Sequence, residues 1–165
     1  MKTTKSIYQA AWQGLSMAKI DHQMSTMPPA GKIDMLNWVE QYPAAPLTTF
    51  TLAHTDEMLY IRFEVKGEVP LATKTKDLEP VNEDACVEMF IGDKDNTHYW
   101  NFEFNPTGVC NASYRKERKV DVVRLNAEQL ASIQRFPVQL CAAHWSLLVA
   151  IPLALCSTAR MVRKA

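Results

Sequence analysis

The sequence lacks a long hydrophobic run. Its longest apolar stretch, residues 147–156, is interrupted by Pro152, and a membrane-spanning helix needs about 20 apolar residues. The basic start with Lys2 and Lys5 is not followed by a continuous apolar segment, so no secretory signal is recognisable. The chain alone therefore predicts no membrane span and a cytoplasmic location, unless a signal lies outside it.

A net charge is also missing, because 18 basic residues balance 18 acidic ones. This balance argues against nucleic acid or an anionic membrane as partner, since both attract excess positive charge. The four cysteines form no Cys-x-x-Cys pair, which argues against zinc and favours reduced, buried thiols over disulfides. With five glycines and nine prolines, no collagen-like or low-complexity segment is expected.

Sequence motifs of common enzymes are missing as well. There is no Gly-x-x-x-x-Gly-Lys-Ser/Thr loop for phosphate, no Gly-x-Gly-x-x-Gly and no Gly-x-Ser-x-Gly elbow, which are the local signatures of nucleotide binding and of serine hydrolases. The four histidines are scattered without a His-Glu-x-x-His pair. Nothing in the sequence indicates a nucleophile.

What the sequence does contain is alternation of apolar and polar residues from residue 46 onward, the period of strands. The segments are 47–52, 59–65, 86–91, 99–104, 109–114 and 145–151. The gaps between them at 53–59 and 92–98 are too short for the crossover helices of a parallel sheet. We therefore predict an all-β fold, an antiparallel β-sandwich forming a single domain over residues 1–165. Its interior should contain Leu59, Ile61, Phe63, Val87, Met89, Phe102, Phe104, Leu147 and Val149.

Little helix is expected. Residues 1–32 form an irregular N-terminal segment in this interpretation, because Gly14 and the Pro28-Pro29 pair limit any helix to a few turns. Asn126 followed by Gln129 is a capping-box pattern and predicts one short helix near 126–135. Residues 154–165 are expected to be a frayed basic tail.

The polar positions of the strands are the candidate binding residues. Should their polar faces coincide on one sheet, they would combine aromatic rings, a guanidinium, an amide and carboxylates, a mixture that binds sugar hydroxyls and the apolar side of a sugar ring. The residues are Tyr60, Arg62, Glu88, Tyr99, Asn101 and Glu103. The alternative is a solvated face with cross-strand Arg–Glu pairs.

Two other kinds of chemistry are weaker candidates. Glu88 and Glu103 on neighbouring strands could form the acid and base of a glycoside hydrolase. Asp93 and Asp95 lie in an acidic turn that could hold calcium through oxygen ligands, although a plain polar hairpin turn is the simpler explanation. No cofactor is required by any motif.

Three segments together resemble the bacterial carbohydrate-binding family 9-like proteins, relatives of the family 9 carbohydrate-binding module of xylanases. They are Leu-Asn-Trp-Val-Glu at 36–40 with Tyr42-Pro43, Glu-Asp-Ala-Cys-Val-Glu-Met-Phe-Ile at 83–91, and Tyr-Trp-Asn-Phe-Glu-Phe-Asn-Pro-Thr-Gly at 99–108. The strand at 59–65 and the segment at 145–153 also fit. The resemblance spans residues 33–153.

The resemblance implies a jelly-roll-like sandwich that binds sugar without catalysis, often beside a hydrolase, with calcium as a structural ion and a periplasmic or extracellular role. Glu88 falls where the xylanase module has a sugar-binding Glu, and Glu103 falls on the strand where that module has a binding Arg. In the family further strands follow the 151–153 segment, and the resemblance implies that they are not represented in residues 154–165. An open sheet edge, and with it a homodimer, is therefore expected.

Carbohydrate binding, as an accessory to polysaccharide breakdown, is the function these observations favour. The alternatives are a structural or protein-interaction sandwich that has lost its sugar site, and a glycoside hydrolase.

Overall fold

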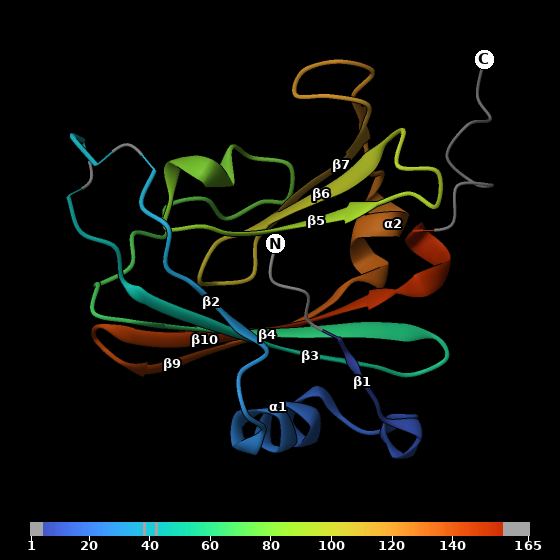
Figure 1. Cartoon of the computed structure of the whole chain (residues 1–165), viewed down its shortest axis with the longest axis horizontal. Coiled ribbons are helices and arrows are strands. Elements are labelled where there is room, and N and C mark those ends of the chain that lie inside the picture. The colour runs from blue at the N-terminus through green and yellow to red at the C-terminus, as the bar shows by residue number, and fades with distance from the viewer. Residues whose placement is uncertain (1–4, 38, 42, 157–165) are drawn as a thin grey trace. The chain divides into compact units, whose positions relative to one another are not determined.

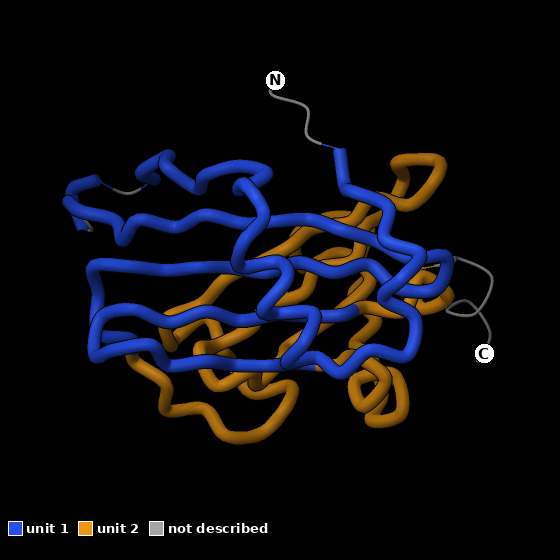
Figure 2. The backbone as a smooth tube through the Cα atoms, turned by 90° about the horizontal axis from the view of Figure 1, so that it is seen from below, with its two compact units in different colours: residues 1–70, 135–150 blue, residues 71–134, 151–165 orange. Residues whose placement is uncertain are grey.

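The computed structural model of the chain describes residues 5–37, 39–41 and 43–156. Its residues form two compact units. The first comprises residues 1–70 with 135–150 and the second comprises residues 71–134 with 151–165 (Figure 2). Each unit is built around one β-sheet, and the sheets are described separately below. Trp38, Tyr42 and residues 157–165 of the predicted tail lie outside the described residues, and the first residues of that tail, 154–156, belong to a 3-10 turn instead of being frayed.

The sheet of the first unit has six strands in the order β1-β3-β4-β10-β9, with β2 also paired to β3. Within it, the antiparallel β3–β4 hairpin runs in register from Leu47 opposite Lys66 to His54 opposite Leu59. The strands are β1 (Ile7–Tyr8), β2 (Gly31–Ile33), β3 (Leu47–His54), β4 (Met58–Lys66), β9 (Gln134–Cys141) and β10 (His144–Pro152).

The N-terminal segment is more regular than the sequence suggested. After a 3-10 turn, η1 (Ala10–Trp12), it forms the helix α1 (Met17–Thr26), followed by β2. Gly14, with φ +79°, and the Pro28-Pro29 pair lie on either side of this helix. The residues taken as helix breakers therefore delimit a ten-residue helix, because a left-handed Gly and a Pro pair act as boundaries outside the element.

Helix α1 packs its apolar stripe on one face of the first sheet (Figure 1). Ile20 and Met24, one turn apart, are buried against Tyr60 of β4 and Leu148 of β10. Trp12 meets the Tyr60 ring edge-to-face, with ring centroids 5.4 Å apart. These contacts make the helix and the six-stranded sheet a single packed unit, since an amphipathic helix is stabilised mainly by burial of its apolar face.

The sheet of the second unit has four strands in the order β5-β6-β7-β8. They are β5 (Val87–Gly92), β6 (Tyr99–Phe104), β7 (Cys110–Arg115) and β8 (Val123–Arg124). Successive strands pair antiparallel. The unit also contains the 3-10 turns η2 (Val81–Glu83) and η3 (Leu153–Cys156) and the short helix α2 (Ala127–Ser132).

The predicted interior matches the observed burial. Seven of the nine residues named from the strand alternation are buried, and Leu59 and Met89 are half-buried. Phe102 and Phe104 are fully enclosed at 0% exposure, whereas Phe90 of the adjacent strand is 59% exposed. The strand register read from the sequence is therefore correct, because a slip of one residue would have exchanged the two faces.

A buried carboxylate ties the loop before β5 to the turn after β6. Asp84 accepts hydrogen bonds from the backbone N–H groups of Thr73 and Lys74, both at 2.9 Å, and from Nδ2 of Asn105 at 3.0 Å. Asn105 Oδ1 in turn accepts from the backbone N–H of Thr107 at 3.1 Å and of Val109 at 2.9 Å. The turn at 105–108, which contains the turn residues Pro106 and Gly108, is thus held by the side chain of its first residue.

The fold class predicted from the sequence is confirmed. The chain is mostly β with two sheets and little helix, in agreement with an all-β sandwich. The short helix predicted near 126–135 is α2, and both hydrogen bonds of its Asn126–Gln129 capping box are present. Strand β9 was not predicted, because the sequence interpretation extended that helix to 135.

The edges of the first sheet are occupied differently. On one side β1 and β2 both pair with β3, so the N-terminal segment covers that edge. On the other side lies β9, which is mostly exposed and carries Pro137, a residue suited to edge strands because it donates no hydrogen bond. A homodimer through an open edge stays a prediction. No helix within the described ranges is long and apolar enough to cross a membrane.

Replacing Phe102 by Ala should lower the free energy of unfolding by about 3–5 kcal/mol, because it leaves a cavity where a fully buried ring was. Phe90→Ala on the neighbouring strand is the matched control and should cost under about 1 kcal/mol, since an exposed ring loses little burial. Urea denaturation of both variants measures the difference. Equal losses in the two variants would show that the burial of the two faces is misassigned.

The Asp84 network predicts a dependence of stability on pH. Burial alone would raise the pKa of Asp84, but hydrogen bonds from Asn105, Thr73 and Lys74 outweigh it and lower that pKa far below its usual range. Stabilisation by the ionised carboxylate is then complete above the unfolded pKa of about 4 and lost as the pH falls below it.

Asp84→Asn should therefore be destabilising at neutral pH, and the difference from the parent chain should shrink on acidification to about pH 3. Denaturation curves across that range test this, with the exposed Asp121→Asn as a control that makes the same change in charge. A difference between parent and Asp84→Asn that does not vary with pH would contradict the assignment.

Candidate functional site

One face of the second sheet is polar, and the alternation of three strands produces it. Because β5, β6 and β7 pair in register, their outward residues line up in three rows across the sheet. The rows are Glu88, Glu103 and Asn111; then Phe90, Asn101 and Ser113; then Gly92, Tyr99 and Arg115. These nine positions are called the polar face below. The opposite face carries the buried Trp100, Phe102 and Phe104.

The guanidinium of Arg115 links two rows of the polar face. Its Nε donates to Ser113 Oγ at 2.9 Å, and its Nη2 donates to Asn101 Oδ1 at 2.7 Å. Asn101 and Ser113 are each only 2% exposed, so they form the floor of the face under the Arg115 side chain. The amide Nδ2 of Asn101 is buried and has no hydrogen-bond partner among the described residues.

The first row brings two carboxylates together. Glu88 and Glu103 are direct cross-strand partners, and Asn111 Nδ2 donates to Glu103 Oε2 at 2.9 Å. Burial and then the neighbouring charge of Glu103 raise the pKa of Glu88, against the opposite effect of Arg115 and Arg118. Like charges opposite each other in a sheet are unfavourable, so hydroxyl donors from a ligand would relieve this pair.

An aromatic pair completes the polar face. The rings of Phe90 and Tyr99 lie with centroids 5.8 Å apart, and the Phe90 side chain is among the exposed large apolar groups of the chain. An exposed ring beside hydrogen-bonding groups suits the apolar C–H side of a sugar ring. The face therefore offers a stacking surface, forked donors and carboxylate acceptors within three neighbouring strands.

The structure divides the six binding residues predicted from the sequence between the two sheets. Glu88, Tyr99, Asn101 and Glu103 come together on the polar face, and their role in sugar binding stays a prediction. Tyr60 and Arg62 belong to β4 of the first sheet instead. The expectation that all six share one sheet is corrected, because alternation gives the side of a strand that a residue occupies but not the sheet to which the strand belongs.

Tyr60 and Arg62 are also engaged within the first unit. Each is 5% exposed, and Tyr60 packs against Trp12 beside α1. Arg62 forms ion pairs with Asp21 of α1 at 2.8 Å and with Glu64 at 2.9 Å. Glu64 also pairs with Lys66 and His144. These groups attach the helix to its sheet.

Apart from Gly92, which has no side chain, the sequence analysis missed four residues of the polar face: Phe90, Asn111, Ser113 and Arg115. A signal for them was present, because the period of two that selects Glu88 on β5 also selects Phe90. The same period along the return strand selects the other three. The three residues of β7 were overlooked because its segment, predicted over 109–114, was used only as a strand and its polar side was not assigned.

The turn expected to hold calcium is organised by hydrogen bonds. Asp93 is buried and accepts from the Thr97 backbone N–H at 2.9 Å and from the Tyr114 hydroxyl at 3.1 Å. Asp95 is exposed in the same turn. Within the part of the chain that the structure describes, no three histidine, cysteine or acidic side chains are grouped so as to hold a metal ion. Calcium at Asp93 and Asp95 remains a prediction.

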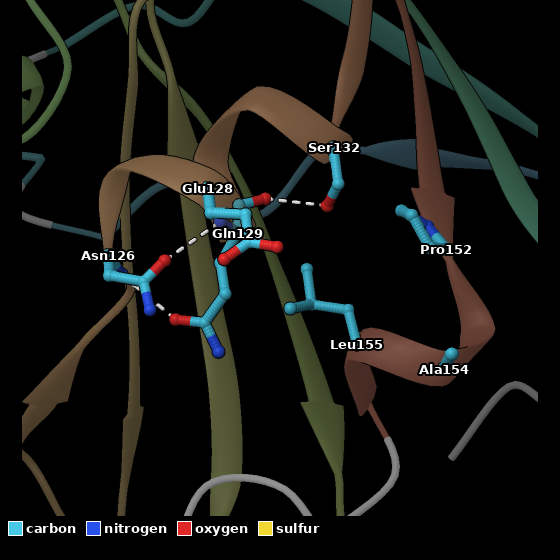
Figure 3. A pocket seen from close by; sticks show the side chains of 7 residues that line it. All are labelled: Asn126, Glu128, Gln129, Ser132, Pro152, Ala154 and Leu155. Atoms are coloured by element: carbon cyan, nitrogen blue, oxygen red, sulfur yellow. Dashed lines mark hydrogen bonds between the residues drawn. The ribbon is translucent and has the colours of Figure 1, made fainter.

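A cavity of about 410 Å³ lies elsewhere in the second unit, between α2 and η3 (Figure 3). Its size is within the range of small-molecule sites. Its lining includes Asn126 and Gln129, whose side chains are occupied in the helix cap, and Ser132, whose hydroxyl donates to the Gln129 carbonyl at 2.7 Å. The seven lining residues include no aromatic ring and no cation, so we favour the polar face as the binding site.

Comparison with known proteins places the chain in a family. The family model for carbohydrate-binding family 9 matches residues 18–161, and the chain therefore belongs to this family. A crystal structure of a proposed carbohydrate-binding protein from Bacteroides uniformis is similar, with a TM-score of 0.66 and 27% identity. The match covers 75% of this chain and 60% of that one. No curated protein matched.

The carboxylate pair predicts a measurable titration. Replacing Glu103 by Gln removes the neighbouring charge, so the raised pKa of Glu88 should move down toward its usual value. Carboxyl carbon shifts followed by NMR during a pH titration measure this. Glu117→Gln, in the exposed connection after β7, is the control and should leave the Glu88 titration unchanged. A Glu88 pKa that does not respond to Glu103→Gln would show that the two groups are not coupled.

Proposed function

We propose that this chain binds carbohydrate without catalysis, through the polar face of its four-stranded sheet. The observation that carries the proposal is the grouping on that face of an exposed aromatic ring, a guanidinium, amides and carboxylates. Membership of carbohydrate-binding family 9 supports it, as does the likeness to a proposed carbohydrate-binding protein. A role as an accessory to polysaccharide breakdown is part of the same proposal.

Different groups of the polar face would contact different parts of a bound sugar. Phe90 and Tyr99 would cover the apolar side of a sugar ring, since aromatic rings offer a large apolar contact surface to its C–H groups. Glu88 and Glu103 would accept hydrogen bonds from neighbouring hydroxyl groups, and Asn101 and Arg115 would donate to sugar oxygens. Side chains held by cross-strand hydrogen bonds lose little freedom on binding, which favours affinity.

The expected consequence is that Phe90→Ala lowers affinity for the bound sugar at least about tenfold, because a stacking contact with an exposed ring is lost. Isothermal titration calorimetry against a panel of mono- and oligosaccharides measures it. Tyr8→Ala is the matched control, since Tyr8 is a similarly exposed aromatic residue at 51% on the other sheet. Equal affinities of the parent chain and Phe90→Ala would exclude the polar face.

The panel also separates the two alternative functions. A structural or interaction module would bind none of the sugars while folding normally. A glycoside hydrolase acting through Glu88 and Glu103 would release the chromophore from an aryl glycoside, and the release would stop in Glu88→Gln. The non-catalytic proposal expects sugar binding without such turnover.

A further inference from the structure

Arg115 is a guanidinium held by neutral groups alone. Its Nε and Nη2 donate to Ser113 and Asn101, which are both buried. Within the described ranges it has no carboxylate in ion-pair distance, and its Nη1 has no hydrogen bond. A guanidinium keeps its charge at every physiological pH. The side chain is therefore fixed in position with an unneutralised charge and a donor group left for a ligand.

A second donor without a partner lies beside it. The Nδ2 of Asn101 is buried without a hydrogen bond, while Oδ1 of the same amide accepts from Arg115. A buried donor left unpaired is costly, so an oxygen acceptor reaching this point would stabilise the site. The two free donors belong to adjacent groups joined by one hydrogen bond of 2.7 Å.

Charges of both signs surround this end of the polar face. Lys116, Arg118 and Lys119 follow Arg115 in the exposed connection to β8 together with Glu117 and Asp121, and Asp93 and Asp95 lie in the turn between β5 and β6. The carboxylates of Glu88 and Glu103 belong to the far row, four residues along β6 from Tyr99, or about 14 Å at about 3.4 Å per residue. The positive charges of Arg115 and Arg118 both act to lower the pKa of Glu88, so they partly offset its negative charge.

From these observations we infer that the Tyr99–Arg115 end of the polar face binds the carboxylate of an acidic sugar, so that the ligand is a uronic acid or a polysaccharide containing one. The inference rests on the proposed function. The carboxylate would take hydrogen bonds from Nη1 of Arg115 and Nδ2 of Asn101, while the sugar ring lies on Tyr99 and Phe90. A planar two-oxygen group fits a guanidinium and a neighbouring amide better than a hydroxyl does.

Calorimetry of the full chain with matched pairs of methyl glycosides tests the inference. The pairs are glucuronate with glucose, galacturonate with galactose and mannuronate with mannose, and glucose 6-sulfate is added as an anion of different shape. In every pair that binds, the uronate should bind at least about tenfold more tightly than the neutral sugar, because its hydrogen bonds are charge-assisted. Glucose 6-sulfate should not gain this advantage.

Arg115→Gln should reduce the ratio of uronate affinity to neutral-sugar affinity to about one. Lys116→Gln is the matched control, because it makes the same change in charge at an exposed residue just after β7, outside the polar face, and should keep the ratio. Thermal melts test whether both variants fold. If Arg115→Gln does not fold, Arg115→Lys replaces it and should also lower the ratio, because lysine keeps the charge but lacks the planar, forked N–H donors of a guanidinium.

The outcomes separate this inference from the proposed function. Neutral sugars that bind as tightly as the uronates would overturn the carboxylate site and leave carbohydrate binding intact. Equal losses in Arg115→Gln and Lys116→Gln, or equal gains for sulfate and carboxylate, would reduce the effect to general attraction between charges and overturn it as well. A chain that binds no member of the panel would overturn both.

Discussion

The register between β5, β6 and β7 is the constraint on which the candidate site depends. Val87 lies opposite Phe104, and Phe104 lies opposite Cys110, so one choice of pairing places the apolar side chains of all three strands together. The same choice aligns Glu88, Asn101 and Arg115 on the other side. A slip of one residue in any strand would bury charge and expose Phe102 and Phe104. Hydrophobic burial on one face thereby enforces the arrangement of polar groups on the other.

Hydrogen bonds at the end of this sheet reinforce the register. The Asp84–Asn105 network joins the loop that enters β5 to the turn that leaves β6, next to the row of Glu88 and Glu103. A carboxylate that accepts several hydrogen bonds is among the stronger polar anchors of a folded chain. It holds the start of β5 without occupying any group of the polar face, so structural and binding roles belong to different side chains.

The two units use charged residues for different purposes. In the first, Arg62 is neutralised by Asp21 and Glu64 and is nearly enclosed, which suits the attachment of α1 to its sheet. In the second, Arg115 is held by a hydroxyl and an amide, which orient the guanidinium without cancelling its charge. In a buried ion pair the two charges compensate each other, whereas an oriented cation with neutral partners is available to an anionic group. This contrast distinguishes two arginines that look alike in the sequence.

Much of this protein follows from the sequence alone. Alternation of apolar and polar residues identified the main strands and the burial of Phe102 and Phe104, and local hydrogen-bonding chemistry identified the helix cap at Asn126. These depend on neighbours in the chain, so a local pattern is sufficient. The tertiary structure decided which strands share a sheet, and therefore that Tyr60 and Arg62 lie under α1 while Arg115 joins Asn101. Pairing between distant strands depends on the summed burial of the whole sheet, which no single segment encodes.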